Sequence, residues 1–333
     1  MSKDKKQILY FLTKMITFIV IFIAVFTCIN NIFLTKSDNL YNYINYSNQT
    51  ENSIDILIMG SSHSMDGISA RKLDSILSES YGVETHSFNM SITGMRLEQI
   101  HYRLMEALKT QTPKLLIIET FSCVPQSTGT NESINRWSLD YVPLSINKLQ
   151  YIEDEIEEEL KTSFVLPFIK YHSRWKELTS EDFEIMSREK TKRKSFHQGV
   201  EAPNKPDFVG TEDDYFAQDF TLITQQRELP EDYKIYMRKI LEVCKSIDCK
   251  VLFLSIPYKV QADFYATELI KYNNFLQKEY VDETEVYMYD MNKAIPELKW
   301  GYQYMTDEGH VNNSGREVIN QELAKRINGI WSK

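Results

Sequence analysis

A short polar motif, Gly60-Ser61-Ser62-His63, follows an apolar run near the start of the chain. The apolar run predicts a strand before the motif, and a helical pattern begins soon after it. A serine at such a junction lies near unpaired helix amides and a positive partial charge, which stabilise an oxyanion and favour a nucleophilic hydroxyl. The alternative is an ordinary helix cap, because serine is a favoured N-cap residue.

Two later loops carry polar groups that can act with such a serine. The first, residues 88–95 (FNMSITGM), contains Gly94, whose amide is a candidate donor to a substrate oxygen; a turn glycine is the alternative. The second, residues 304–319, places Asp307 and His310 three residues apart. This spacing lets the carboxylate hold one ring nitrogen while the other takes a proton from a serine. A pair of surface residues is the alternative.

The elements around these motifs alternate between strands and helices. Such alternation predicts parallel strands joined by crossover helices. The expected fold is therefore a three-layer α/β/α, doubly wound parallel sheet of about five strands, in which ligands bind at the C-terminal ends of the strands. Strands are predicted at 54–60, 83–90, 113–120, 250–257 and 285–291, and helices at 68–80, 95–110, 230–247, 262–280 and 313–331.

Residues 121–228 interrupt this alternation and are predicted to form an insertion or cap over the sheet. Within it, the segment LPFIKYHSRWKEL contains His172, Arg174 and Trp175 among apolar residues. Arginine binds carboxylates or phosphates in a bidentate manner, and tryptophan stacks on sugars, so these residues are candidate substrate contacts. A packed helix with a surface charge is the alternative.

The three motifs, in this order, resemble the SGNH (GDSL-type) hydrolase superfamily. Gly60-Ser61-Ser62 stands where that family has Gly-Asp-Ser, which implies that Ser62 is the nucleophile. Gly94 best matches the glycine of its second block, an oxyanion donor. The resemblance further implies that Asp307 orients His310, that His310 is the general base, and that the sheet is flavodoxin-like.

The third block of that family, Gly-x-Asn-Asp, is not found here, because residues 117–123 read IIETFSC. Its asparagine completes the oxyanion hole, and losing one such donor costs about 3–4 kcal/mol of transition-state stabilisation. Candidates to line the site in its place are Glu119, Thr120 and Ser122. Asn89 is a further stand-in, although a buried structural asparagine is the alternative.

The neighbours of the nucleophile, Ser61 and His63, are also candidates for the oxyanion or substrate site. A water-exposed histidine at a helix start is the alternative for His63.

The N-terminus predicts a membrane anchor. Lys3, Lys5 and Lys6 precede the apolar segment 8–34, which is long enough to cross a bilayer. Residues 1–7 are then cytoplasmic, residues 35–53 form a polar juxtamembrane spacer, and residues 54–333 are exported. A cleaved signal peptide is the alternative, but the end of the segment, VFTCINNIF, has no A-x-A pattern.

Charge and cysteine content narrow the class of protein further. The formal net charge of -9 argues against nucleic acid as a partner. No spacing predicts a metal site, and no cofactor is expected. Two of the four cysteines, Cys244 and Cys249, flank a predicted turn and either pair or remain free thiols.

Together with the anchor, the Gly-Ser-Ser motif resembles the membrane-anchored branch of the superfamily, typified by D-alanyl-lipoteichoic acid transfer proteins and alginate-type O-acetyltransferases. That resemblance implies a single-pass plasma-membrane enzyme whose catalytic domain is extracytoplasmic. It would transfer or hydrolyse acyl groups on a cell-envelope polysaccharide or teichoic-acid-like polymer through an acyl-serine, beside a multispanning membrane acyltransferase. Two alternatives remain: a non-catalytic scaffold of the same fold, and a simple secreted esterase or lipase.

Overall fold

The computed structural model describes residues 3–35, 37–125, 132–184, 198–200, 205–206, 220–258, 263–307 and 309–332. The chain divides into two compact units, which are described separately. One comprises residues 1–37 and 143–190, and the other comprises residues 38–142 and 191–333.

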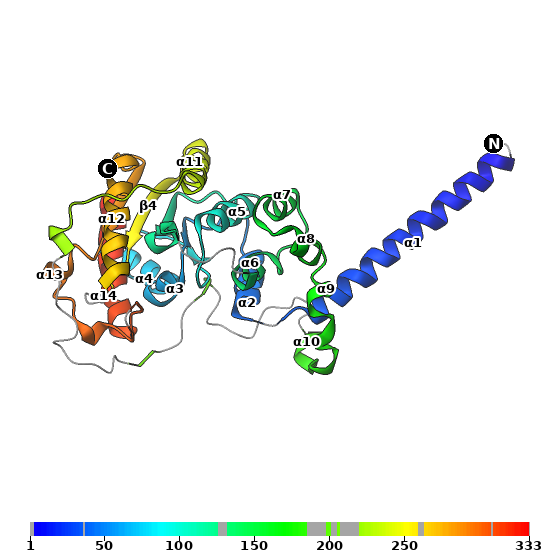
Figure 1. Cartoon of the computed structure of the whole chain (residues 1–333), viewed down its shortest axis with the longest axis horizontal. Helices are drawn as coiled ribbons and strands as arrows, with labels where there is room; N and C mark the ends of the chain where they lie inside the picture. The colour runs from blue at the N-terminus through cyan, green and yellow to red at the C-terminus, as the bar shows by residue number, and fades with distance from the viewer. Residues whose placement is uncertain are drawn as a thin grey trace. The chain divides into compact units, whose positions relative to one another are not determined.

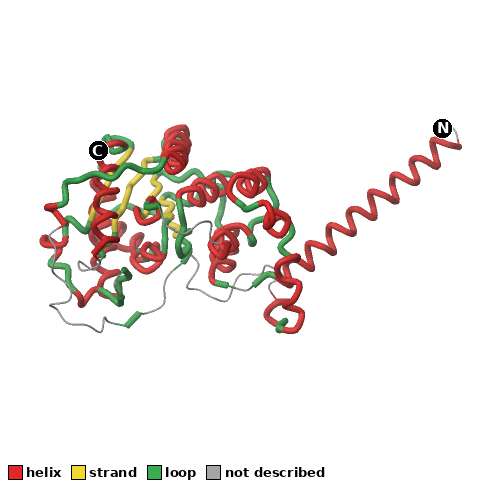
Figure 2. The backbone as a smooth tube through the Cα atoms, in the orientation of Figure 1, coloured by secondary structure: helices red, strands yellow, loops and turns green. Residues whose placement is uncertain are grey.

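The larger unit is built on a five-stranded parallel sheet in the order β2-β1-β3-β4-β5. Figure 2 shows its strands in yellow among the helices. This order is flavodoxin-like and confirms the predicted fold class. The strands are short and mostly buried, as expected for a parallel sheet that is covered on both faces. They are β1 (Ile56–Met59), β2 (Ser87–Asn89), β3 (Leu115–Glu119), β4 (Lys250–Ser255) and β5 (Val286–Asp290).

Helices cover both faces of this sheet, because alternate strand residues point to opposite sides. On one face, Ile56 and Ile58 of β1 belong to a core with residues of α4 (Ala70–Tyr81) and α14 (Asn313–Trp331). On the other face, Leu57 and Met59 belong to a core with α5 (Leu97–Ala107) and α11 (Glu231–Ser246). The helices α4, α11, α12 and α14 are labelled in Figure 1.

The remaining elements of this unit are short helices and one further long helix. They are α2 (Asp38–Ser47), α3 (Ser62–Gly67), η1 (Thr120–Cys123), α6 (Glu132–Leu139), η6 (Phe220–Leu222), α12 (Asp263–Glu279), α13 (Ile295–Leu298) and η7 (Tyr302–Tyr304).

Residues 38–47, predicted to be part of a polar spacer, instead form the helix α2. The ring of Tyr46 packs edge-on against Phe88 of β2, with 5.5 Å between ring centroids. Its hydroxyl donates to the Ala107 carbonyl at 2.8 Å. Leu40 and Ile44 are buried beside it at helical spacing. This part of the predicted spacer therefore packs as part of the sheet unit.

The smaller unit combines the N-terminal helix with part of the predicted insertion. Its α1 (Lys3–Phe33) contains one stretch, Lys5–Phe33, that is long and apolar enough to cross a membrane. A helix of this kind near an N-terminus is found both in anchors and in signal sequences. The insertion contributes α7 (Ile146–Glu155), α8 (Glu158–Val165), α9 (Phe168–Tyr171), η2 (His172–Lys176) and α10 (Ser180–Glu184).

Candidate active site

The turn between β1 and α3 admits only glycine at position 60. A Cβ there would lie 2.5 Å from the Glu119 Cβ and 2.5 Å from the Ser64 Oγ, far inside van der Waals contact. The next residue, Ser61, is the N-cap of α3, and its hydroxyl accepts from the His63 amide at 3.3 Å. The capping role that the sequence left open therefore falls to Ser61, and Ser62 becomes the first residue of α3.

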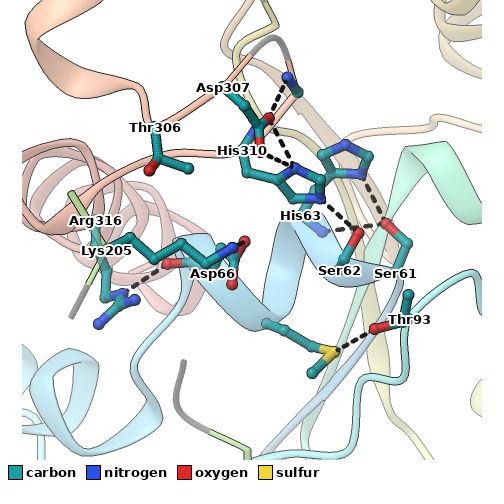
Figure 3. A network of polar contacts seen from close by, with 12 residues as sticks. Ser61, Ser62, His63, Asp66, Thr93, Lys205, Thr306, Asp307, His310 and Arg316 are labelled. Atoms are coloured by element: carbon teal, nitrogen blue, oxygen red, sulfur yellow. Dashed lines mark hydrogen bonds and ion pairs between the residues drawn. The ribbon is translucent and has the colours of Figure 1, made fainter. Parts of the chain in front are cut away.

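The side chains of Ser62, His310 and Asp307 lie within hydrogen-bonding distance of one another in a row (Figure 3). The imidazole of His310 lies between the Ser62 hydroxyl and the Asp307 carboxylate. His310 Nε2 lies 2.8 Å from Ser62 Oγ, although the two residues are 248 positions apart. His310 Nδ1 lies 2.8 Å and 3.0 Å from the two carboxylate oxygens of Asp307. This arrangement allows the acid to fix the tautomer in which Nε2 can accept the serine proton.

Local hydrogen bonds fix the loop that carries Asp307 and His310. Asp307 Oδ1 accepts from the amides of Gly309 and His310, each at 2.9 Å. Burial opposes ionisation of Asp307, but these bonds and the His310 ring lower the pKa of its carboxyl below the ordinary value. Asn312 then caps α14 by accepting from the Gly315 amide at 3.0 Å, which ties the loop to the helix.

His63 adds a second imidazole to this site. Its ring stacks on that of His310, with 4.8 Å between centroids and 9° between planes. Its Nδ1 lies 2.8 Å from Ser61 Oγ and 3.0 Å from the Tyr258 hydroxyl. His63 is buried, and this burial, with His310 close by, lowers its pKa to about 3. The second ring is therefore neutral at physiological pH.

Glu119, at the end of β3, lies beneath the start of α3. Its Oε2 accepts from the Ser61 hydroxyl at 2.6 Å and from the Ser61 amide at 3.3 Å, and its Oε1 accepts from the Phe121 amide at 2.7 Å. Burial raises the pKa of Glu119 to about 7 against the effect of these bonds. The sequence made Glu119 a candidate to line the site in place of the missing asparagine; the structure links it through the Ser61 hydroxyl to His63 Nδ1.

Two other candidates to line the site, Thr120 and Ser122, have hydroxyls that remain available to donate a hydrogen bond. The hydroxyls of Thr120 and Ser122, both in η1, are buried, and neither finds a hydrogen-bond partner among the described residues.

Asn89 takes the structural role that the sequence left as its alternative. Its side-chain amide donates to the carbonyls of Ser64 at 3.2 Å and Ile68 at 3.1 Å, and its oxygen accepts from the Ser91 amide at 3.1 Å. Both amide hydrogens are thus used within the protein. The Asn89 amide therefore has no hydrogen left to donate to a substrate oxyanion.

Gly94 lies in the loop after β2, with a φ of +68° that favours glycine. A Cβ would also lie 2.6 Å from Ile134 Cδ1. These two constraints account for a glycine as a turn residue. The preceding Thr93 hydroxyl donates to the Met65 sulfur at 3.6 Å, so the loop reaches α3 about one turn beyond Ser62 (Figure 3).

The three candidates in the insertion belong to the smaller unit rather than to the unit that holds Ser62. Arg174 donates to the carbonyls of Phe33 at 2.5 Å and Leu34 at 2.8 Å, at the C-terminal end of α1. His172 Nδ1 lies 2.8 Å from the Ile169 carbonyl. Trp175 is exposed beneath the Lys176 ammonium, which lies 5.1 Å from the ring centroid. Arg174 therefore makes structural contacts with the C-terminal end of α1.

The cysteines are free thiols, including the buried Cys244 and Cys249. Among the residues that the structure describes, no three His, Cys, Asp or Glu side chains gather in a way that could hold a metal ion.

No family model and no curated protein matches the chain. One solved structure that matches is that of a candidate acylhydrolase from Bacteroides fragilis NCTC 9343, at 12% sequence identity. The match covers 89% of this chain and 100% of that one with a TM-score of 0.39, which is too low to support an argument.

Proposed function

We propose that this protein is a serine-dependent acyl-transfer enzyme in which Ser62 is the nucleophile, His310 the general base and Asp307 the orienting acid. The observation that carries the proposal is the 2.8 Å contact between Ser62 Oγ and His310 Nε2, with Asp307 on the opposite ring nitrogen. The motif resemblance to SGNH hydrolases supports the same assignment.

The proposed reaction has two steps. Ser62 Oγ attacks an ester carbonyl while His310 Nε2 takes its proton; the tetrahedral intermediate then collapses as His310 protonates the departing alkoxide, leaving an acyl-serine. In the second step His310 deprotonates an incoming hydroxyl, which attacks the acyl-serine; the tetrahedral intermediate collapses as His310 returns the proton to Ser62 Oγ and the free serine is restored. A sugar hydroxyl as acceptor gives transfer, whereas water gives hydrolysis. The amides of Ser62 and Gly94 are the proposed oxyanion donors.

The proposed setting is the outer face of the plasma membrane, with α1 as a retained anchor. Support comes from the end of α1, where Arg174 binds the carbonyls of Phe33 and Leu34 and the Asn30 side chain accepts from the Phe168 amide. Signal cleavage near this point would discard these contacts. The proposed substrate is a cell-envelope polysaccharide or teichoic-acid-like polymer, and a multispanning membrane acyltransferase is the proposed donor partner.

The test compares envelope-polymer acylation in cells that carry the wild-type protein, Ser62→Ala or Ser75→Ala. Ser75 lies on α4, where its exposed hydroxyl donates to Glu79, so it is a matched control. We expect Ser62→Ala to abolish acylation and Ser75→Ala to leave it unchanged. Normal acylation with Ser62→Ala, at equal protein level, would refute the proposal.

A non-catalytic scaffold is the second candidate, and the missing third-block asparagine is the observation that favours it. A scaffold that only binds a polymer or a membrane partner requires no base. It predicts normal acylation in cells with His310→Ala, whereas the enzyme predicts loss.

A further inference from the structure

The C-terminal end of α1 differs from the rest of the helix because other elements of the protein cover it. Residues 5–25 of α1 are exposed, and residues 29–33 are partly covered. The covering elements are α9, η2 and α10, each of which contacts α1 (Figure 1). All of them belong to the smaller unit.

Specific contacts fix these elements on the helix. The Phe168 ring lies edge-on to Phe26 and Phe33, at 6.3 Å and 5.2 Å between centroids. The Phe168 amide donates to Asn30 Oδ1 at 2.7 Å. Arg174 joins the helix end to Asp182, whose carboxylate accepts from its guanidinium at 3.2 Å. The segment therefore keeps a fixed height along α1.

That height coincides with the end of the apolar part of α1. A helix needs about 20 residues to cross the hydrocarbon core, and the apolar segment 8–34 carries two adjacent amide side chains, Asn30 and Asn31, near its end. Phe26 lies about 6 Å below Asn30 along the axis, at 1.5 Å per residue. Because Phe168 contacts both, α9 lies at the boundary between hydrocarbon and headgroups of any bilayer that α1 crosses.

Large apolar side chains project from this segment into the surroundings. Ile169 is 45% exposed, Trp175 is 63% exposed and Phe183 is 53% exposed. Trp175 lies beside the Lys176 ammonium. Tryptophan is enriched at membrane interfaces, where its ring lies among headgroups, and lysine extends its charge toward water or phosphate.

We propose that residues 168–183 form an interfacial docking segment that lies in the headgroup layer of the bilayer crossed by α1, with Trp175 and Ile169 in contact with lipid. Lipid is favoured over a protein partner because the segment is fixed to the end of the apolar helix, by Phe168 at Phe26 and Asn30 and by Arg174 at the Phe33 and Leu34 carbonyls. The inference rests on the anchor in the proposed function. It gives Arg174 and Trp175 a role other than contact with a substrate.

The test measures membrane depth in the full chain, with one molecule in each phosphatidylglycerol–phosphatidylcholine nanodisc. A nitroxide is attached at Trp175→Cys in a Cys28→Ser background; the other native cysteines are buried. Ile16→Cys, on exposed α1, reports the hydrocarbon core, and Glu159→Cys, exposed on α8 of the same unit, is the matched surface control. Relaxation by oxygen is compared with relaxation by a water-soluble nickel complex.

We expect the oxygen-to-nickel ratio at position 175 to lie between those of the two controls and at least about threefold above that of Glu159→Cys. A ratio equal to that of Glu159→Cys, with Ile16→Cys in hydrocarbon, would overturn the docking segment alone. A water-accessible Ile16→Cys would overturn the anchor and the docking segment together. A label at 175 that is immobilised and shielded from both reagents would mean a protein contact and would also overturn it.

A second measurement needs no new cysteine. In nanodiscs containing brominated lipid, the wild-type chain should lose more tryptophan fluorescence than Trp175→Phe does. Equal fractional quenching in the two chains would contradict lipid contact at Trp175.

Discussion

At the scale of single residues, the acid of the proposed triad is unusually open to water. The Asp307 side chain is 53% exposed, whereas that of His310 is 27% exposed. A carboxylate in this position is solvated, so its charge stabilises an imidazolium less than a buried one does. Its main contribution is then to hold the His310 tautomer through the contact at Nδ1.

The role of Asp307 in holding the His310 tautomer gives the first prediction. Asp307→Asn should lower kcat by about 10²–10⁴-fold, because the amide no longer fixes the tautomer, while the fold and KM are retained. Steady-state turnover of a small acetyl ester measures the effect, with Asp154→Asn, at an exposed position of α7, as the matched control. Turnover within twofold of the wild type would show that Asp307 takes no part.

Glu119 leads to a prediction about pH and stability. Its pKa is raised to about 7, so the folded state holds a proton that the unfolded state releases near pH 4.5. The contribution of Glu119 to the stability of the folded form is therefore lost as the pH rises between these values, by at most on the order of 3 kcal/mol. Glu119→Gln should flatten this dependence. Denaturant unfolding at pH 5 and pH 7.5 gives the change in unfolding free energy between the two pH values. An equal change in the wild-type and Glu119→Gln chains would contradict the raised pKa of Glu119.

At the scale of elements, the β1–α3 turn sets the position of Ser62. Ser61 caps the helix and binds Glu119, which leaves the next hydroxyl to face His310. The whole turn depends on Gly60, where Glu119 and Ser64 leave no room for a side chain.

Gly60→Ala should therefore destabilise the protein by about 1–3 kcal/mol, the usual cost of overpacking a tight core position, and should displace Ser62. The control is Gly329→Ala on α14, where a Cβ meets nothing within 4 Å and should stabilise the helix by up to about 1 kcal/mol. Midpoints of denaturant unfolding compare the two. A Gly60→Ala chain as stable as the wild type would show that the turn can adjust.

The sheet could be predicted from sequence because its strands are apolar on both faces and are bounded by turn residues. Helix α2 could not be predicted, because its many Asn, Tyr and Ser residues are typical of a polar spacer. In the structure Leu40, Tyr41 and Ile44 are nevertheless buried. The three motifs of the site were visible as residues at strand ends. The stacking of His63 on His310 was not, since it depends on how two distant loops meet.

At the scale of the whole molecule, the chain consists of a sheet unit that carries the proposed chemistry and a helical unit formed around the end of α1. Of the predicted insertion at 121–228, residues 143–190 belong to this helical unit. Its contacts with Phe33, Leu34 and Asn30 would serve no purpose in a mature protein that lacked α1.

The anchor is therefore predicted to remain. Intact mass measurement of the protein recovered from the membrane fraction should give the full chain, including residues 1–34. A mature protein that begins after residue 28, recovered from the soluble fraction, would identify α1 as a signal sequence.

The most direct test of the central claim is covalent labelling with a serine-reactive fluorophosphonate, followed by peptide mass spectrometry. The account predicts one adduct, on Ser62, that forms on the wild-type chain and is lost in the folded His310→Ala chain because the hydroxyl then lacks its base. Labelling of another serine, or equal labelling of Ser62 without His310, would contradict it.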